Sequence, residues 1–265
     1  APGDQPGTYS TLNADAGKIR STLAMTPLGE SGKATIFTNA GGHEIVDLLG
    51  TFNKEFIQSS EQVRLLDTRD ASDSKKVVAG GSFTKIAVPE NQIMQYANKD
   101  VLINLVATDV SADGYIQVMS NLDPSLVGKW SNGNANKGQT KNQLVVARFN
   151  EKGEIYIYNQ SAMNFVADQQ IVFIAGAYEP VNQRALDTRV SGKKAKQGSS
   201  TIVSGRPNGV AFMGVVSDNA TNPGWVQATT TTDAFGATST TNINTPGEIT
   251  SAVTINSLDA SGNGV

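Results

Sequence analysis

The sequence contains no cysteine and only one histidine, His43. Without cysteine the chain forms no disulfide, and it has neither a thiolate nucleophile nor a Cys-ligated metal site. A single imidazole without a Ser–Asp constellation beside it makes neither a catalytic triad nor a zinc site. We therefore expect no enzymatic activity and no cofactor, and we interpret His43 as a residue on the exposed side of a strand.

Charged residues and long apolar runs are also scarce. Asp, Glu, Lys and Arg make up 17% of the 265 residues, against roughly 25% in average soluble proteins. The net charge of −3 gives no basic surface that would neutralise nucleic-acid phosphates. The longest apolar run, at residues 171–177, is far shorter than the roughly 20 residues of a membrane helix. We expect no nucleic-acid partner and no membrane span.

What the sequence does contain is a series of short β-rich runs separated by turn residues. Residues 154–158 read Glu-Ile-Tyr-Ile-Tyr and residues 114–118 read Gly-Tyr-Ile-Gln-Val, while Asn132-Gly133 marks a turn. No amphipathic stripe of ten or more residues at helical spacing is present. We predict an all-β protein built of tandem β-sandwich or jelly-roll-like modules.

The chain repeats itself at long range. The hexapeptide Arg-Leu-Leu-Asp-Thr-Arg at residues 64–69 returns 120 residues later (187 − 67) as Arg-Ala-Leu-Asp-Thr-Arg at residues 184–189. Residues 10–42 align with residues 131–163 at a constant offset of 121 (138 − 17). The matches include loop glycines, which mark backbone that needs a positive φ or a close approach. A period of this length indicates repeated domains rather than a small solenoid.

The repeats divide the chain into modules, and the modules at both ends are predicted to be incomplete. The division is as follows: 1–52, the closing half of a module, in which 33–52 is a hairpin that could be donated; 53–63, a linker; 64–178, a complete β-module; 179–183, a linker; and 184–265, the opening part of a module that lacks its last hairpin. A longer natural chain would also explain both incomplete modules, and this alternative stays open.

This order of segments resembles a repeat module of secreted and cell-surface proteins of actinobacterial type. The matching segments are the Arg-x-Leu-Asp-Thr-Arg motif, Ser10-Thr11-Leu12-Asn13, Gly138-Gln139-Thr140, Gly32-Lys33-Ala34-Thr35-Ile36-Phe37 and Ile45-Val46-Asp47-Leu48-Leu49-Gly50-Thr51-Phe52. The resemblance implies β-rich surface or spacer units with no common reaction, and an extracellular location on a cell or virion surface. The complete module departs from the pattern at its end, where residues 171–178 lack the Asp.

The repeated Asp-Thr-Arg motif has two interpretations. Its guanidinium forks could bind a carboxylate or phosphate ligand, or the Asp could cap a turn and pair with the neighbouring Arg side chains. Repetition in each module favours a structural joint, because catalytic sites are seldom copied in every repeat. The joint residues are Arg64, Asp67, Arg69, Arg184, Asp187 and Arg189.

Two kinds of loop are weaker candidates for ligand binding. Trp130, in the polar loop 128–137, could stack on a sugar if exposed, whereas Trp225 takes the position of Tyr115, which favours packing. The hairpin loops have oxygen side chains but no Asp-x-Asp-x-Asp-Gly ladder, so ordinary Asx turns are favoured over calcium and we assign no metal site. The loop residues concerned are Asp109, Asp113, Asp218 and Asn222.

The function that we expect is structural, with copies of the same chain as the partner. The chain would be a subunit of an extracellular filament or surface layer, assembled head-to-tail when the N-terminal strands of one copy complete the C-terminal module of another. The apolar assembly residues would be Ile36, Phe37, Ile45, Val46, Leu48, Leu49 and Phe52.

Two alternatives and one difficulty accompany this expectation. The chain could instead be a surface- or virion-displayed adhesin or carbohydrate-binding module that binds a cell-surface glycan through the polar loops around Trp130 and around Asp218–Trp225. The two ends of one chain could also close into a single intramolecular domain. The difficulty is that residues 17–25 and 247–255 are copies of the same strand, so that one copy is redundant in a composite module.

Overall fold

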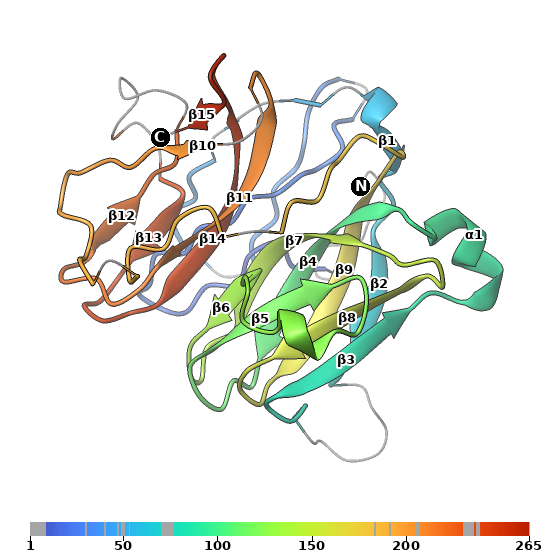
Figure 1. Cartoon of the computed structure of the whole chain (residues 1–265), viewed down its shortest axis with the longest axis horizontal. Coiled ribbons are helices and arrows are strands. Elements are labelled where there is room, and N and C mark those ends of the chain that lie inside the picture. Colours follow the sequence, from blue (N-terminus) through green and yellow to red (C-terminus); the bar gives the residue numbers. More distant parts are fainter. Residues whose placement is uncertain are drawn as a thin grey trace.

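The computed structural model describes residues 9–264 except 30, 40, 47, 49–50, 53, 70–76, 183, 191, 205–206, 230–235 and 237–238. It is nearly all β, and its strands form several antiparallel sheets (Figure 1), which confirms the predicted fold class. The helical elements are short: η1 (Lys54–Phe56), η2 (Glu90–Gln92), α1 (Ile93–Tyr96) and η3 (Pro124–Leu126). No helix among the described residues has the length and apolar character needed to cross a bilayer.

Residues 57–173 form two sheets that enclose the main core, and we call this part the central sandwich. One sheet has the order β1-β9-β4-β7, with β2 also paired to β9, and the other has the order β3-β8-β5-β6. The strands are β1 (Ile57–Ser59), β2 (Val63–Asp67), β3 (Ser82–Ala87), β4 (Asp100–Thr108), β5 (Gly114–Met119), β6 (Gly133–Ala135), β7 (Lys141–Arg148), β8 (Glu154–Asn159) and β9 (Asn164–Phe173).

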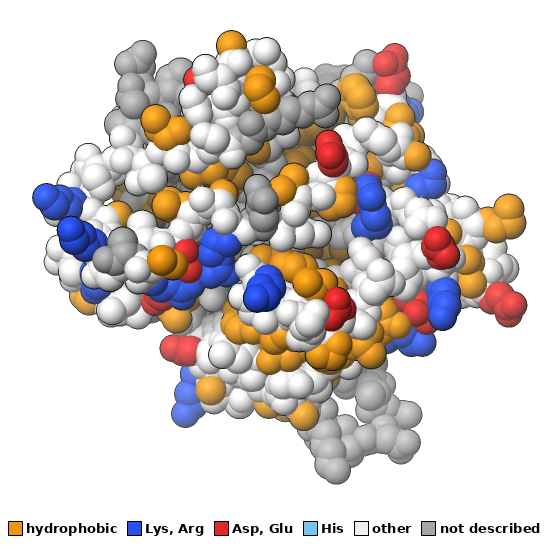
Figure 2. Space-filling view, in the orientation of Figure 1, with side chains coloured by type: hydrophobic (Ala, Val, Ile, Leu, Met, Phe, Trp, Pro, Cys, Tyr) orange, Lys and Arg blue, Asp and Glu red, His pale blue; other side chains and the backbone are white. Residues whose placement is uncertain are grey.

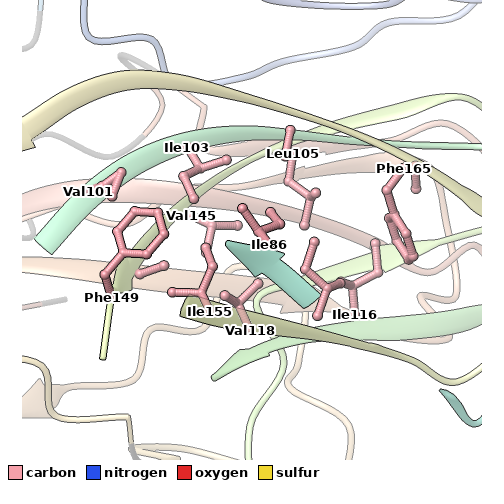
Figure 3. Packing of buried hydrophobic residues seen from close by; sticks show 14 of the residues in the cluster. Ile86, Val101, Ile103, Leu105, Ile116, Val118, Val145, Phe149, Ile155 and Phe165 are labelled. Atoms are coloured by element: carbon pink, nitrogen blue, oxygen red, sulfur yellow. The ribbon is translucent and has the colours of Figure 1, made fainter. Parts of the chain in front are cut away.

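The core of the central sandwich lies between the two sheets. Figure 3 shows Ile103 and Leu105 of β4 on one side of it, and Ile116 and Val118 of β5 with Ile155 of β8 on the other. In β8 buried and half-buried residues alternate, as expected for a strand with one face on the core. All ten residues of β9 are buried, because β9 lies inside its sheet and both faces of that sheet are covered.

Residues 184–264 form a second region, which we call the C-terminal unit. Its strands make three two-stranded antiparallel sheets, β10-β15, β11-β14 and β12-β13. These sheets match the β3-β8, β4-β7 and β5-β6 pairs of the central sandwich in chain order, and Val210 faces Ser257 as Asp100 faces Arg148. The strands are β10 (Val203–Ser204), β11 (Val210–Ser217), β12 (Gly224–Val226), β13 (Thr241–Ile243), β14 (Thr250–Ser257) and β15 (Asn263–Gly264).

The N-terminal segment, residues 9–52, has no strand or helix among its described residues. Its first part packs between the other two regions, where Leu23 and Met25 join a second apolar cluster. The central sandwich contributes Leu102, Leu144, Ile171 and Phe173 to this cluster, and the C-terminal unit contributes Phe212 and Val253. Both ends of the chain therefore cover the outer face of the five-stranded sheet (Figure 1).

Candidate assembly site

The turn at residues 64–69 is held by one carboxylate that two arginines share. Asp67 accepts hydrogen bonds from Arg64 Nη1 at 2.9 Å and from Arg69 Nε and Nη2 at 2.9 and 2.6 Å. It also accepts one from the backbone N–H of Arg69 at 3.1 Å. The Arg69 side chain is the main reason why the pKa of Asp67 is lowered. These guanidinium groups therefore bind a carboxylate of the same chain.

Arg64 also connects the turn to β9. Its Nε donates to a carboxylate oxygen of Asp168, a residue only 1% exposed that lies opposite Arg64 in the β2-β9 ladder. Burial raises the pKa of Asp168, and the hydrogen bond from Arg64 opposes that shift. A buried carboxylate is costly unless it is paired. In the observed register of β2 and β9, Arg64 therefore pairs with this buried carboxylate.

The second copy of the turn has the same local geometry but no strand before it. Asp187 accepts hydrogen bonds from Arg184 Nη1 at 2.9 Å and from Arg189 Nε and Nη2 at 2.9 and 2.7 Å. These bonds, first of all those from Arg189, hold the pKa of Asp187 well below its usual range. Residues 184–187 are nevertheless irregular. Within the described part of the chain, Arg184 pairs with Asp187 and has no counterpart of Asp168 opposite it.

Within the described part of the chain, strand β11 of the C-terminal unit has a strand partner along one edge only, and we call the other its free edge. β4 lies between β7 and β9, whereas β11 pairs only with β14 among the described strands. Every residue of β4 except Thr108 is buried, and no residue of β11 is. Val210 and Val216, near the two ends of β11, are 58% and 42% exposed. Unpaired N–H and C=O groups along such an edge are a template for another strand.

Residues 33–52, which the sequence predicts to be a donated hairpin and which we call the donor hairpin, have no strand among their described residues and expose a series of large apolar side chains. Exposed fractions are 59% for Ile36, 60% for Phe37, 89% for Ile45, 68% for Val46, 81% for Leu48 and 42% for Phe52. Leu49 lies outside the described residues. Hydrophobic side chains are also exposed elsewhere, as Figure 2 shows for one face of the molecule. Charged side chains are scattered over that face. Apolar side chains grouped in one segment mark an interaction surface.

The donor hairpin is the sequence counterpart of β8 and β9. The offset of 121 continues without a gap past residue 42, so that residues 33–38 align with β8 and residues 43–52 with β9. Asp47, which lies outside the described residues, then aligns with Asp168. Residues 171–178 lack the Asp of the pattern, but at the continued offset the position of Asp47 is taken by Asp168. Extending the offset by ten residues would have identified Asp168.

Three copies of one segment lie at residues 10–25, 131–146 and about 240–255. The first copy contacts the second, and the second contacts the third. Asn13 of the first copy donates its backbone N–H and its Nδ2 to Asn142 Oδ1, at 2.8 and 2.6 Å. Asn134, which aligns with Asn13, donates its backbone N–H to Ser251 Oγ at 3.1 Å. Ser251 aligns with Asn142, so the second copy contacts the third as the first contacts the second.

The third copy contacts the first and thereby closes the cycle. Ser21, which aligns with Asn142 and Ser251, donates to the backbone oxygen of Thr240 at 3.3 Å. The aligned residues Leu23, Leu144 and Val253 all belong to the second apolar cluster. Each of the three copies therefore contacts the other two. The repeated strands 17–25 and 247–255 occupy different positions in the single chain, so neither copy is redundant there.

A small polar cavity lies beside this contact region. It has a volume of about 20 Å³, and Lys141, Arg20 and Ser251 are among the residues that line it. Lys141 Nζ donates to Ser251 Oγ at 3.4 Å, and Arg20 lies 3.5 Å from Glu248. Burial, with a smaller contribution from the charge of Arg20, lowers the pKa of Lys141 to about 8. The space is enough for about one water molecule and not for an organic ligand.

Two other predicted candidates are Trp130, in the loop 128–137, and His43, which lies within the donor hairpin. Trp130 is half-buried and its indole N–H donates to Asn132 Oδ1 at 3.2 Å. His43 is exposed, as expected, but its described neighbours do not form the expected strand. Within the described ranges, no group of His, Asp and Glu side chains could hold a metal ion.

Trp225 differs from the packed residue that its alignment predicts. It is 52% exposed, whereas Tyr115 at the equivalent position is half-buried with its ring centroid 5.8 Å from that of Tyr158. Tyr158 lies on β8, and its counterpart at the offset of 121 is Phe37 of the donor hairpin. Among the described residues, Trp225 has no aromatic ring contact like the one between Tyr115 and Tyr158.

No known protein-family model matches the sequence, and no curated protein is significantly similar to it.

Proposed function

We propose that this protein is a structural subunit of an extracellular filament or surface layer, in which residues 33–52 of one copy complete the C-terminal unit of another. One observation supports this most directly. The free edge of β11 occurs in the same chain as an exposed apolar segment that aligns with β8 and β9, and β9 covers the corresponding edge of β4.

The chemistry of the two surfaces is complementary. A strand added beside β11 gains main-chain hydrogen bonds, and its apolar side chains leave water. In the central sandwich the strand at this position contacts both β4 and β2, and all of its residues are buried. Residues 43–52, in the equivalent position, would contact β11 on one side and residues 184–187 on the other.

The geometry of this contact favours a polymer. The donor hairpin and the free edge are different surfaces of one chain, so the contact is heterologous and leaves one unused surface of each kind at the ends of any chain of copies. Such a contact propagates into a filament or layer unless it closes into a ring. The extracellular location rests on the resemblance of the segments to modules of surface proteins.

Electron microscopy and sedimentation velocity of purified variants test the proposal. We expect the intact chain to form filaments or layers at micromolar concentration, and the variant Ile45→Asp/Val46→Asp to stay monomeric, because a charged strand cannot be buried beside β11. Met94→Asp is the matched control, since Met94 is 95% exposed on α1, outside both surfaces. A monomeric intact chain, or assembly that survives Ile45→Asp/Val46→Asp, would overturn the proposal.

A further inference from the structure

We infer that two side chains of the C-terminal unit select the register of the incoming hairpin: Arg184, which pairs with Asp47 of a second copy, and Trp225, which packs on Phe37 of the same copy. The inference rests on the proposed function and names the residues that recognise the partner. It draws on two contacts that the central sandwich makes within itself.

The first contact is the buried ion pair between β2 and β9. Arg64 binds Asp67 of its own turn and, through Nε, Asp168 of the neighbouring strand. Arg184 binds Asp187 in the same way, at the same 2.9 Å. Arg184 and Asp47 align with Arg64 and Asp168, respectively. The acceptor therefore offers a positive group where the incoming strand has a carboxylate, and a strand in any other register would bury that carboxylate unpaired.

The second contact is the aromatic pair between β5 and β8. Tyr115 and Tyr158 have ring centroids 5.8 Å apart. Trp225 and Phe37 align with these two residues, and they are 52% and 60% exposed. Both rings therefore face water in the single copy, and docking of the hairpin would bury them against each other.

The two pairs together specify a single register. Phe37 and Asp47 align with residues of two different strands, Tyr158 of β8 and Asp168 of β9. A slip of one residue turns every side chain of a strand to the other face. Both pairs would then be lost together, so a shifted hairpin gains no compensating contact at either point.

Exchange of the two charges tests the ion pair. In Asp47→Arg alone two arginines meet at every joint, and in Arg184→Asp alone two aspartates meet. We expect each variant to raise the critical concentration for assembly at least about 10-fold. In an equimolar mixture that alternates, every joint pairs an arginine with an aspartate, so assembly should return close to that of the intact chain. The double variant should also assemble, because each of its joints is matched.

Tryptophan emission tests the aromatic pair. The chain has two tryptophans, so Trp130→Phe leaves Trp225 as the single reporter. Its emission should shift to shorter wavelength on assembly, and Phe37→Ala should abolish that shift. The reciprocal variant Trp225→Phe, with Trp130 as reporter, should show no shift.

The outcomes separate this inference from the proposed function. If the intact chain does not assemble, both are overturned. If the intact chain assembles while Asp47→Arg assembles equally well, or the mixture fails to recover although both variants melt like the intact monomer, only the register is overturned. If Arg184→Asp does not fold, Asp47→Arg and Asp47→Asn in the donor hairpin decide the point, since the acceptor is unaltered in both.

Discussion

Residues 64–69 and 184–189 differ at one position out of six and adopt the same turn, yet only the first copy is joined to a strand. In both, one Asp accepts hydrogen bonds from the Arg three residues before it and from the Arg two residues after it. The Asp–Arg hydrogen bonds that the two copies share are therefore local. Among the described strands, Val63–Asp67 pairs with β9 alone, and residues 184–187 have no such partner among the described residues.

A second pair of segments shows the same dependence on neighbours. β9 is buried along its whole length, while residues 43–46 and 48 at the equivalent positions of the donor hairpin are exposed. β-propensity measures how well side chains pack on neighbouring strands more than any backbone preference. The difference between the two regions is a difference of partners, and four experiments test that interpretation.

The largest expected effect comes from the same substitution at two aligned phenylalanines. Phe173 is 3% exposed and its ring contacts those of Tyr178 and Phe212, so Phe173→Ala should lower the free energy of unfolding by about 3–5 kcal/mol. Phe52 is 42% exposed, and Phe52→Ala should change the monomer by less than about 0.5 kcal/mol. Urea unfolding below the assembly concentration measures both. Equal losses would mean that the donor hairpin is already packed in the single copy.

Hydrogen exchange should distinguish the two copies of the hexapeptide. Amides of residues 64–67 should be protected with or without assembly. Amides of residues 184–187 should exchange fast in the monomer and slow by about 10- to 100-fold on assembly, because they gain strand partners. A synthetic peptide of residues 33–52, added to the monomeric Ile45→Asp/Val46→Asp variant, should give the same protection. Protection of 184–187 without any partner would contradict the comparison.

These comparisons also distinguish the features that the sequence predicts from those that depend on distant contacts. The fold class follows from the short β-rich runs, and the loop glycines follow from the alignment, since Gly17, Gly138 and Gly247 have φ values of 69°, 71° and 79°. The turn that residues 64–69 and 184–189 share can also be predicted, because its Asp–Arg hydrogen bonds lie within the hexapeptide. The same alignment also predicts Asp168, because an offset of 121 places Asp47 on it. The apolar run at residues 171–178 resembles residues 45–52 in composition and hides this match.

The place of the N-terminal segment could not be predicted from its residues. Residues 9–25 have no strand pairing, and hydrogen bonds to partners far along the chain, such as those from Asn13 to Asn142, hold them in place. No periodicity identifies such a partner. The exposure of Trp225 was missed for a related reason, because packing inferred from Tyr115 assumes that the neighbour of Tyr115 is also present.

A smaller effect is expected from the two shared carboxylates. Asp67 has 6% of its side chain exposed and Asp187 has 16%, so Asp67→Asn should cost about 1–2 kcal/mol and Asp187→Asn clearly less. Both pKa values are lowered by folding. The stabilisation is therefore complete above the unfolded pKa of about 3.9, and it is lost as the pH falls through the lower folded pKa. Melting temperatures between pH 7 and pH 2 should converge for the intact chain and each variant. If Asp187→Asn lost more stability than Asp67→Asn, the expected order of the two effects would be wrong.

The smallest effect concerns the first residue of β7, where Lys141 stands at the position that Thr250 takes in β14. Burial lowers the pKa of Lys141 to about 8, below the unfolded value of about 10.4. Below pH 8 the lysine is charged in both states and folding bears the whole cost of burying it. Between pH 8 and about 10.4 the folded chain releases the proton first, so stability increases with pH.

We therefore expect Lys141→Met to raise the melting temperature at pH 7 by about 2 °C, and this advantage to shrink as the pH approaches 10.4. Lys129→Met controls for the loss of one positive charge, because Lys129 is exposed. The comparison requires thermal unfolding of three proteins at several pH values. An advantage of Lys141→Met that stays constant up to pH 10.4 would mean that the side chain is solvated. The contact between the N-terminal segment and β7 would then be looser than its hydrogen bonds indicate.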